Sequence, residues 1–167
     1  MLRIIAAIIF ISAGTIAGAS RAHTLKYKLE ICQSIKIMLR EITLYIRSTG
    51  ADVYRIVSEL KKIKSLESLL FIEELPTEFE PDSDFRSKWR KAVNAQTDLP
   101  DEEKKILLSL GDIIGTSDIE GQTTAINGLQ SELDAIEQTR RDMLIKKGKL
   151  YRSVGMLFGV MAGILVI

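Results

Sequence analysis

The stretch "IEGQTTAINGLQSELDAIEQTRRDMLIKKGKL", from Ile119 to Leu150, decides the predicted fold of this chain. Its apolar side chains recur every seven residues at two positions, which together form one stripe along a helix. The stripe consists of Ile119, Ile126 and Leu133 at the first position and Leu129, Ile136, Met143 and Leu150 at the second. Such a stripe must be covered by other helices, so the stretch predicts one long helix that packs in a helical core.

The carboxyl end of this predicted helix is basic. Arg140 and Lys147 take over the first position of the stripe, so packing against the core should loosen there. The basic residues of this region are Arg140, Arg141, Lys146, Lys147, Lys149 and Arg152. Because a basic side chain near anionic lipid headgroups contributes about 1 kcal/mol, we expect them to form a membrane neck.

Both ends of the sequence are apolar. Residues 4–19, "IIAAIIFISAGTIAGA", and residues 154–167, "VGMLFGVMAGILVI", carry no charge. We predict a transmembrane helix at residues 1–20, a cytoplasmic helical bundle at residues 21–150 and a second transmembrane helix at residues 151–167. The basic residues beside both spans place the middle of the chain inside. The first segment also fits a signal peptide cleaved after Ala19, which would leave a secreted helical protein.

Glycines recur every fourth residue in both apolar ends. They are Gly14 and Gly18 in the first and Gly155, Gly159 and Gly163 in the second. This spacing puts small residues on one helix face, where two backbones can approach closely in lipid. We therefore predict transmembrane packing through these glycines; the alternative is that membrane helices are simply rich in glycine.

The rest of the sequence predicts further helices. Apolar spacing indicates helices over residues 25–46, 53–63 and 66–71, followed by one around Phe85, Trp89 and Val93. Another should begin near Pro100, capped by Thr97 or Asp98, and end at a glycine, either 111 or 115. With three prolines and eleven glycines in 167 residues, the composition also suits helices. The predicted fold class is an all-α, antiparallel bundle of about six helices.

One loop of the sequence stands out by its charge. Residues 73–84, "EELPTEFEPDSD", contain two prolines and several acids, including Glu73, Glu74, Glu78 and Glu80. An acidic loop can dock a basic partner, but such a run is more often only a solvated loop. We keep both interpretations.

The sequence lacks the residue patterns of most enzymes. It contains no phosphate-binding glycine loop, no dinucleotide fingerprint and no nucleophile elbow. His23 is the only histidine and Cys32 the only cysteine, so a histidine triad or a metal cluster is not expected in one chain. The formal net charge of +1 gives no reason to propose nucleic acid as a partner. We expect no enzyme activity, no cofactor, no metal and no small-molecule substrate.

Several segments together resemble a known family. They are "MLREI" at residues 38–42, "LSLGDIIGTSD" at residues 108–118 with Gln122, and the ending "KLYRSVGMLFGVMAGILVI". In this combination the chain resembles the stage III sporulation protein AB family of endospore-forming bacteria. The matching residues are Glu41, Gly111, Gly115, Asp118, Gln122 and Gly155.

The resemblance implies a mother-cell membrane protein in a secretion-like channel complex between mother cell and forespore. It implies a helical domain similar to the cytoplasmic domains of type II secretion F and type IV pilus platform proteins, which couple to an ATPase, here the sporulation AA protein. It supplies no catalytic residues. Glu41 and Asp118, with the acidic loop, are the residues that we expect to contact partners. The rival interpretation is a membrane signalling adaptor that dimerises through a coiled coil.

Overall fold

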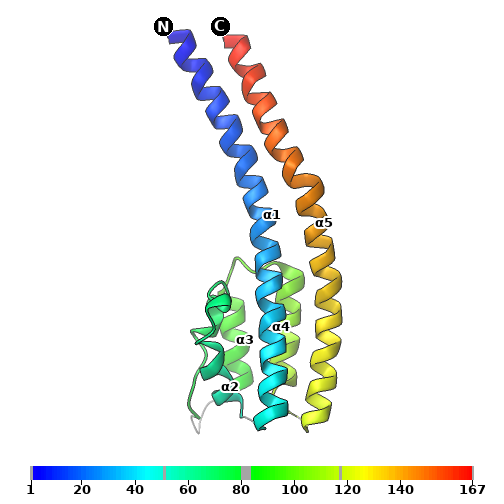
Figure 1. Ribbon diagram of the computed structural model, residues 1–167. Helices are drawn as coiled ribbons and strands as arrows, with labels where there is room; N and C mark the ends of the chain where they lie inside the picture. Colours follow the sequence, from blue (N-terminus) through cyan, green and yellow to red (C-terminus); the bar gives the residue numbers. More distant parts are fainter. Residues whose placement is uncertain (1, 51, 80–83, 117, 167) are drawn as a thin grey trace. The chain divides into compact units, whose positions relative to one another are not determined.

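A computed structural model describes all residues except 1, 51, 80–83, 117 and 167 (Figure 1). At some further positions of the two terminal regions it describes the helical backbone but not the side chain. The described residues form five α-helices and two 3₁₀ turns, with no strand, which confirms the all-α prediction. The elements are α1 (Leu2–Thr49), α2 (Val53–Leu60), η1 (Lys64–Leu66), η2 (Leu70–Ile72), α3 (Phe85–Ala95), α4 (Asp101–Ile113) and α5 (Ile119–Val166).

The chain divides into two compact units. Residues 30–137 form the first, which we call the bundle and which contains α2, α3, α4 and the adjoining parts of α1 and α5. Residues 1–29 and 138–167 form the second, which we call the terminal unit. Because α1 and α5 each contribute to both units without interruption, the predicted continuity between the core helices and the apolar ends is confirmed.

The bundle core is built from the stripes that the sequence indicated. On α5, Ile126 and Leu133 are fully buried, while Ile119 in the first turn is 48% exposed. The facing helix α1 buries one or two adjacent apolar side chains on each turn, namely Ile31, Cys32, Ile35, Met38, Leu39, Ile42 and Ile46. Ile126 and Leu133 are therefore covered within the bundle, whereas Leu129 and Ile136 at the second position of the stripe are half-buried.

A polar contact holds α1 to α5 beside this core. The Lys36 ammonium lies 2.6 Å from Asp134 Oδ1 and 2.9 Å from Glu137 Oε2. Hydrogen bonds to Asp134 and then to Glu137 raise the pKa of Lys36, because both carboxylates favour the charged ammonium. One turn earlier, the Cys32 thiol donates to the Leu133 carbonyl oxygen at 3.7 Å, so the single cysteine is a buried core residue.

The junction between α1 and α2 has the predicted turn chemistry. Gly50 follows the last residue of α1 with a φ of +56°, a left-handed conformation that glycine adopts without strain. The Asp52 carboxylate then accepts from the backbone N–H groups of Tyr54 and Arg55 at 2.9 and 3.0 Å, so it caps α2.

The short helix predicted over residues 66–71 is wrong. In its place the chain forms the 3₁₀ turns η1 and η2. Five apolar residues of this region are buried: Leu66, Leu69, Phe71, Ile72 and Leu75. A continuous α-helix would spread these positions around its circumference, whereas tight turns bring all of them to the core. The described α-helices thus number five rather than about six.

The start of α4 also differs from its prediction. Pro100 is the N-cap residue in place of the predicted Thr97 or Asp98, and it makes no side-chain cap hydrogen bond. Asp101, Glu102 and Glu103 do form an acidic first turn, as expected next to the positive end of a helix. Glu103, however, is fully buried rather than solvated.

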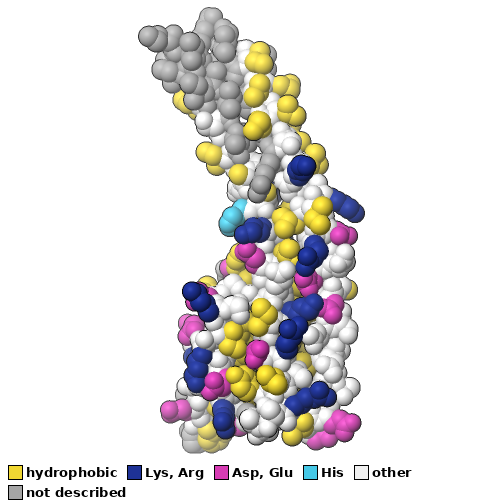
Figure 2. Space-filling model, viewed as in Figure 1, with side chains coloured by type: hydrophobic (Ala, Val, Ile, Leu, Met, Phe, Trp, Pro, Cys, Tyr) yellow, Lys and Arg dark blue, Asp and Glu magenta, His cyan; other side chains and the backbone are white. Residues whose placement is uncertain are grey.

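The terminal unit consists of the first part of α1 and the last part of α5 (Figure 1). Gly18 and Ala22 of α1 are buried, whereas α5 exposes large apolar side chains. Figure 2 shows these hydrophobic side chains toward the carboxyl end of α5, with basic side chains next to them. Within the described residues, no helix combines the length and the apolar character that a membrane crossing requires. The transmembrane helices predicted at residues 1–20 and 151–167 thus have no support in the structure.

Candidate functional site

Helices α3 and α4 pack tightly around the only tryptophan. Trp89 is fully buried, and its indole N–H donates to the Leu107 carbonyl oxygen at 2.7 Å. Gly111 lies directly against the indole, since a Cβ atom built on it would meet Trp89 Cδ1 at 2.3 Å. Only glycine therefore fits at this point of α4. Phe71 completes the cluster with an edge-to-face contact, its ring centroid 5.4 Å from that of Trp89.

Two charged contacts fix the amino-terminal half of α3. The Asp84 carboxylate caps this helix, accepting from Arg86 N–H and from the N–H and hydroxyl of Ser87. The Ser87 hydroxyl is the main cause of the lowered pKa of Asp84, and the two backbone N–H groups act in the same direction. On the next turn, Arg90 Nη2 lies 2.8 Å from Asp112 Oδ2 and ties α3 to α4.

The α4–α5 corner contains three of the residues that carry the family resemblance, Gly115, Asp118 and Gln122. Gly115 follows α4 and has a φ of +78°, a left-handed backbone conformation in which residues other than glycine are strained. Its N–H donates to Gln122 Oε1 of α5 at 2.9 Å, and Asp118 Oδ1 accepts from the N–H of Gly121 at 3.1 Å. Asp118 thus has a capping role at the start of α5, in addition to the partner contact predicted for it.

Gln122→Ala should lower the free energy of unfolding by about 1 kcal/mol, because the corner loses the hydrogen bond to Gly115 at a partly exposed site. Gln130→Ala is the matched control, since Gln130 is a half-buried glutamine of the same helix. Chemical denaturation of the full chain measures both. An equal change in the two variants would show that the corner bond does not stabilise the fold.

The remaining residues predicted for partner contact are scattered over the bundle. Glu41 is half-buried on α1, far in sequence from the acidic loop. Glu73, Glu74 and Glu78 are exposed, and Glu80 lies outside the described residues. Among the described members of this set, Glu74 lines a cavity of about 830 Å³ and Glu73 lines a smaller one of about 30 Å³.

The basic neck predicted on α5 belongs to the terminal unit. Arg141, Lys146, Lys147 and Lys149 are exposed, and Arg140 is half-buried. The side chain of Arg152 lies outside the described part. Of the glycines predicted to pack in a membrane, Gly18 is described and buried, whereas the surroundings of Gly14, Gly155, Gly159 and Gly163 fall outside it.

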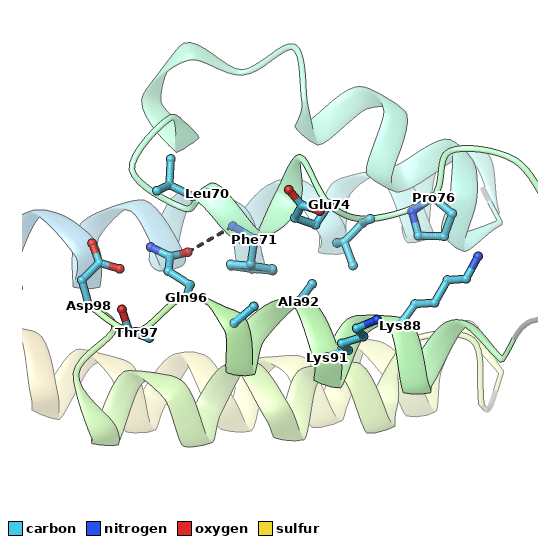
Figure 3. A pocket seen from close by; sticks show the side chains of 12 residues that line it. Leu70, Phe71, Glu74, Pro76, Lys88, Lys91, Ala92, Gln96, Thr97 and Asp98 are labelled. Atoms are coloured by element: carbon cyan, nitrogen blue, oxygen red, sulfur yellow. Dashed lines mark hydrogen bonds between the residues drawn. The ribbon is translucent and has the colours of Figure 1, made fainter.

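A groove of about 830 Å³ runs along α3 within the bundle (Figure 3). One wall comes from α3 and the residues after it, and the other from η2 and the residues that follow it. Its apolar lining is formed by Leu70, Phe71, Leu75, Pro76, Ala92 and Ala95. Lys88, Lys91, Glu74 and Asp98 supply charge. Sequence reasoning missed this groove, because no motif marks the packing of a 3₁₀ segment on a helix.

Gln96 joins the two walls of the groove. Its side-chain oxygen accepts from the Phe71 N–H at 3.1 Å, and its side-chain nitrogen donates to the Ser68 carbonyl oxygen at 3.0 Å. Gln96 is only 7% exposed, so both bonds are shielded from water. One side chain at the end of α3 therefore determines where η2 lies.

The groove combines apolar surface with a few charged side chains. No group of three or more His, Cys, Asp or Glu side chains that could hold a metal ion occurs in the described part of the chain. The amide of Gln96 is already bonded to the backbone. What the groove offers is apolar surface with charged residues along its edge, which suits binding.

Comparison with known proteins adds one finding. The family model of stage III sporulation protein AB matches residues 3–167. This chain belongs to the stage III sporulation protein AB family. Neither a curated protein nor a solved structure matches it.

Membership of the stage III sporulation protein AB family confirms the resemblance noted in the sequence. In the structure, the residues of the segment "LSLGDIIGTSD" have folding roles: Gly111 admits Trp89, and Gly115 and Asp118 form the corner before α5. These roles explain why glycine and a capping acid stand at those positions. Because these residues stabilise the fold, partner binding is expected at other residues on the surface of the bundle.

Proposed function

We propose that this chain is a membrane-attached platform subunit of a sporulation complex between mother cell and forespore, and that a partner ATPase acts on it. Its membership of the stage III sporulation protein AB family carries the proposal. The family description places the chain in stage III of sporulation; the platform role, the mother-cell location and the ATPase are our inference.

The surface of α5 supports attachment to a membrane. Met156, Leu157, Phe158, Met161 and Ile164 are each more than half exposed. A row of exposed, large apolar side chains on a helix is unfavourable in water, and burial in lipid would remove these side chains from water. The exposed lysines that precede them on α5 would then meet the anionic headgroups. We propose that the apolar ends of both α1 and α5 are embedded in the mother-cell membrane and that the bundle faces the cytoplasm.

The seam of α5 supports a platform rather than a dimeric coiled-coil adaptor. Ile126 and Leu133 are fully buried within one chain, so they are not available to pair with a second copy. The sequence also has no phosphate-binding loop, so a platform of this kind would take its energy from a separate ATPase. We propose the sporulation AA protein as that ATPase and the acidic residues Glu73 and Glu78 as part of the contact.

Membrane attachment is tested by flotation of the full chain from sporulating cells. The wild type should float with membranes, and Leu157→Glu combined with Met161→Glu should move most of the protein to the soluble fraction, because charge at these positions opposes burial in lipid. Thr124→Glu with Asn127→Glu adds the same charge at exposed positions of α5 in the bundle and should change nothing. A soluble wild-type chain would refute attachment.

Coupling to the ATPase is tested by co-purification of the full chain with the AA protein. Glu73→Lys with Glu78→Lys should reduce recovery several-fold, because the charge that would attract a basic partner is reversed. Glu67→Lys with Glu132→Lys is the matched control at exposed positions outside the loop. Recovery that is unchanged in all variants would remove the acidic loop from the contact, and no recovery with the wild type would remove the partner.

A further inference from the structure

A continuous chain of hydrogen bonds joins α1, the 3₁₀ segment and the end of α3. The Ser34 hydroxyl donates to the Ser65 carbonyl oxygen at 3.0 Å and accepts from the Ser68 hydroxyl at 2.9 Å. The Ser68 carbonyl oxygen accepts from Gln96 Nε2 at 3.0 Å, and Gln96 Oε1 accepts from the Phe71 N–H at 3.1 Å. We call these five residues the polar layer. Because Ser34 and Gln96 are buried, its two ends are shielded from water.

The 3₁₀ segment takes its position on the bundle from the polar layer. Backbone hydrogen bonds within residues 63–75, such as that from the Leu69 N–H to the Leu66 carbonyl oxygen at 2.8 Å, join residues three apart. Bonds of this kind shape each turn but do not fix where the turns lie on the neighbouring helices. Ser34 of α1 and Gln96 at the end of α3 supply that anchoring, so loss of either bond would let η2 shift.

A second polar contact of α1 lies two residues after Ser34 and joins α1 to α5. The Lys36 ammonium is 2.6 Å from Asp134 Oδ1 and 2.9 Å from Glu137 Oε2. Two residues correspond to about 200° around a helix, so Ser34 and Lys36 point to nearly opposite sides of α1. Glu137 is also the last residue of the bundle on α5, so this contact lies at its border.

Helix α1 connects the two contacts mechanically. Between them, Ile35 is fully buried, and the backbone forms one uninterrupted helix. A single helical turn moves as a rigid piece, so a displacement of Ser34 also displaces Lys36. Hydrogen bonds and ion pairs weaken as their atoms separate, so a small displacement is enough to open the Lys36 contact.

We propose that the polar layer is a conformational coupling device: a shift of η2 passes through Ser68 and Ser34 to α1 and opens the contact between Lys36 and α5. Coupling of this kind is reciprocal, so opening the Lys36 contact also loosens η2. Since η2 forms a wall of the groove, a change in that wall is felt at the border of the bundle. The inference goes beyond the proposed function, because it concerns contacts within the bundle and requires neither a membrane nor an ATPase.

The Lys36 contact has a chemical readout in the full chain. Hydrogen bonds to Asp134 and then to Glu137 raise the pKa of Lys36, and the charged ammonium does not react with acylating reagents. When the contact opens, the pKa falls toward its ordinary value, more of the amine is neutral and acylation becomes faster. A short pulse of an acetylating reagent at neutral pH, applied in detergent micelles and followed by mass spectrometry, measures this rate. Lys105, an exposed lysine of α4, is the internal reference.

Gln96→Leu should raise the acetylation rate of Lys36, relative to Lys105, at least about fivefold, the lower end of typical coupling between two sites. Asn94→Leu, at an exposed position of the same helix, should leave the ratio unchanged. Ile46→Ala removes buried volume from another part of α1 and controls for a general loss of stability. It should also leave the ratio unchanged.

The reverse direction uses hydrogen exchange. Lys36→Met should increase the exchange rate of the Phe71 amide at least about fivefold, because the coupling free energy is the same in both directions. Lys105→Met removes an exposed lysine of α4 that lies outside the polar layer and should have no effect. Ser34→Ala breaks the link between the two contacts, so Gln96→Leu should cause no further increase at Lys36 in that background.

Three results would overturn the inference. If Gln96→Leu speeds exchange at Phe71 but does not change the rate at Lys36, the polar layer only supports η2 locally. If Ile46→Ala raises the rate at Lys36 as much as Gln96→Leu does, the effect is a general loss of stability. If Gln96→Leu acts equally with and without the Ser34 hydroxyl, the coupling does not pass through this residue. Circular dichroism checks folding, and Ser34→Ala with Lys36→Met decides the question if Gln96→Leu is unfolded.

Discussion

Gly111→Ala is expected to lower the free energy of unfolding by about 3 kcal/mol, at the upper end of the usual cost of overpacking a core. The added methyl group would lie 2.3 Å from Trp89 Cδ1 and 2.7 Å from Nε1, far inside van der Waals contact. The indole cannot move away cheaply, because its N–H is bonded to the Leu107 carbonyl and its ring packs on Phe71. Either α3 and α4 separate or the buried hydrogen bond breaks.

Gly128→Ala is the matched control for this prediction. Gly128 is an exposed helical glycine of α5, and a Cβ atom there would meet nothing within 4 Å. Alanine is the better helix former by about 1 kcal/mol, so this variant should be as stable as the wild type or more so. Chemical denaturation of the full chain compares the two. If both substitutions had the same effect, the close contact with Trp89 would not matter.

Gln96→Leu is expected to cost about 2 to 3 kcal/mol, because it removes two shielded hydrogen bonds and leaves the Phe71 N–H buried without a partner. Leucine has a similar volume, so the loss would come from hydrogen bonding rather than from a void. The η2 turn should loosen as a result, which is measurable as faster hydrogen exchange of the Phe71 amide.

Asn94→Leu serves as the control for Gln96. Asn94 is an exposed amide residue of the same helix, two positions earlier. The substitution makes the same change of side-chain type without removing a bond between α3 and η2. Its free energy of unfolding should stay within about 0.5 kcal/mol of the wild type. If the Phe71 amide exchanged hydrogen equally slowly in both variants, the role assigned to Gln96 would be contradicted.

The helices with a clear apolar spacing were predictable from the sequence. The apolar stripe correctly predicted that α5 is one long helix, and the glycine after α1 correctly predicted where that helix ends. Both signals are local, because the first is a repeat along one helix and the second is a single residue that adopts a left-handed conformation. The segment around Leu69 was not predictable in this way. Its conformation depends on a hydrogen bond that the Ser34 hydroxyl donates to the Ser65 carbonyl oxygen. These two residues lie 31 positions apart in the sequence.

The groove was unpredictable for the same physical reason. It exists because Gln96 at the end of α3 holds the backbone at Phe71, a contact between residues 25 positions apart that no local pattern encodes. The acidic loop is conspicuous in the sequence through its charge, yet among its described acids only Glu74 lines the groove. Lys88 and Lys91 gave no signal, since lysines on a short amphipathic helix usually only face water.

The surroundings of Trp89 also supply an optical probe that needs no labelling. The chain has one tryptophan, so all indole emission comes from the junction of α3, α4 and η2. In the native protein the emission should be blue-shifted, and opening of this junction should move it toward longer wavelengths. A spectrometer can therefore follow the integrity of the bundle directly, even with detergent or vesicles present.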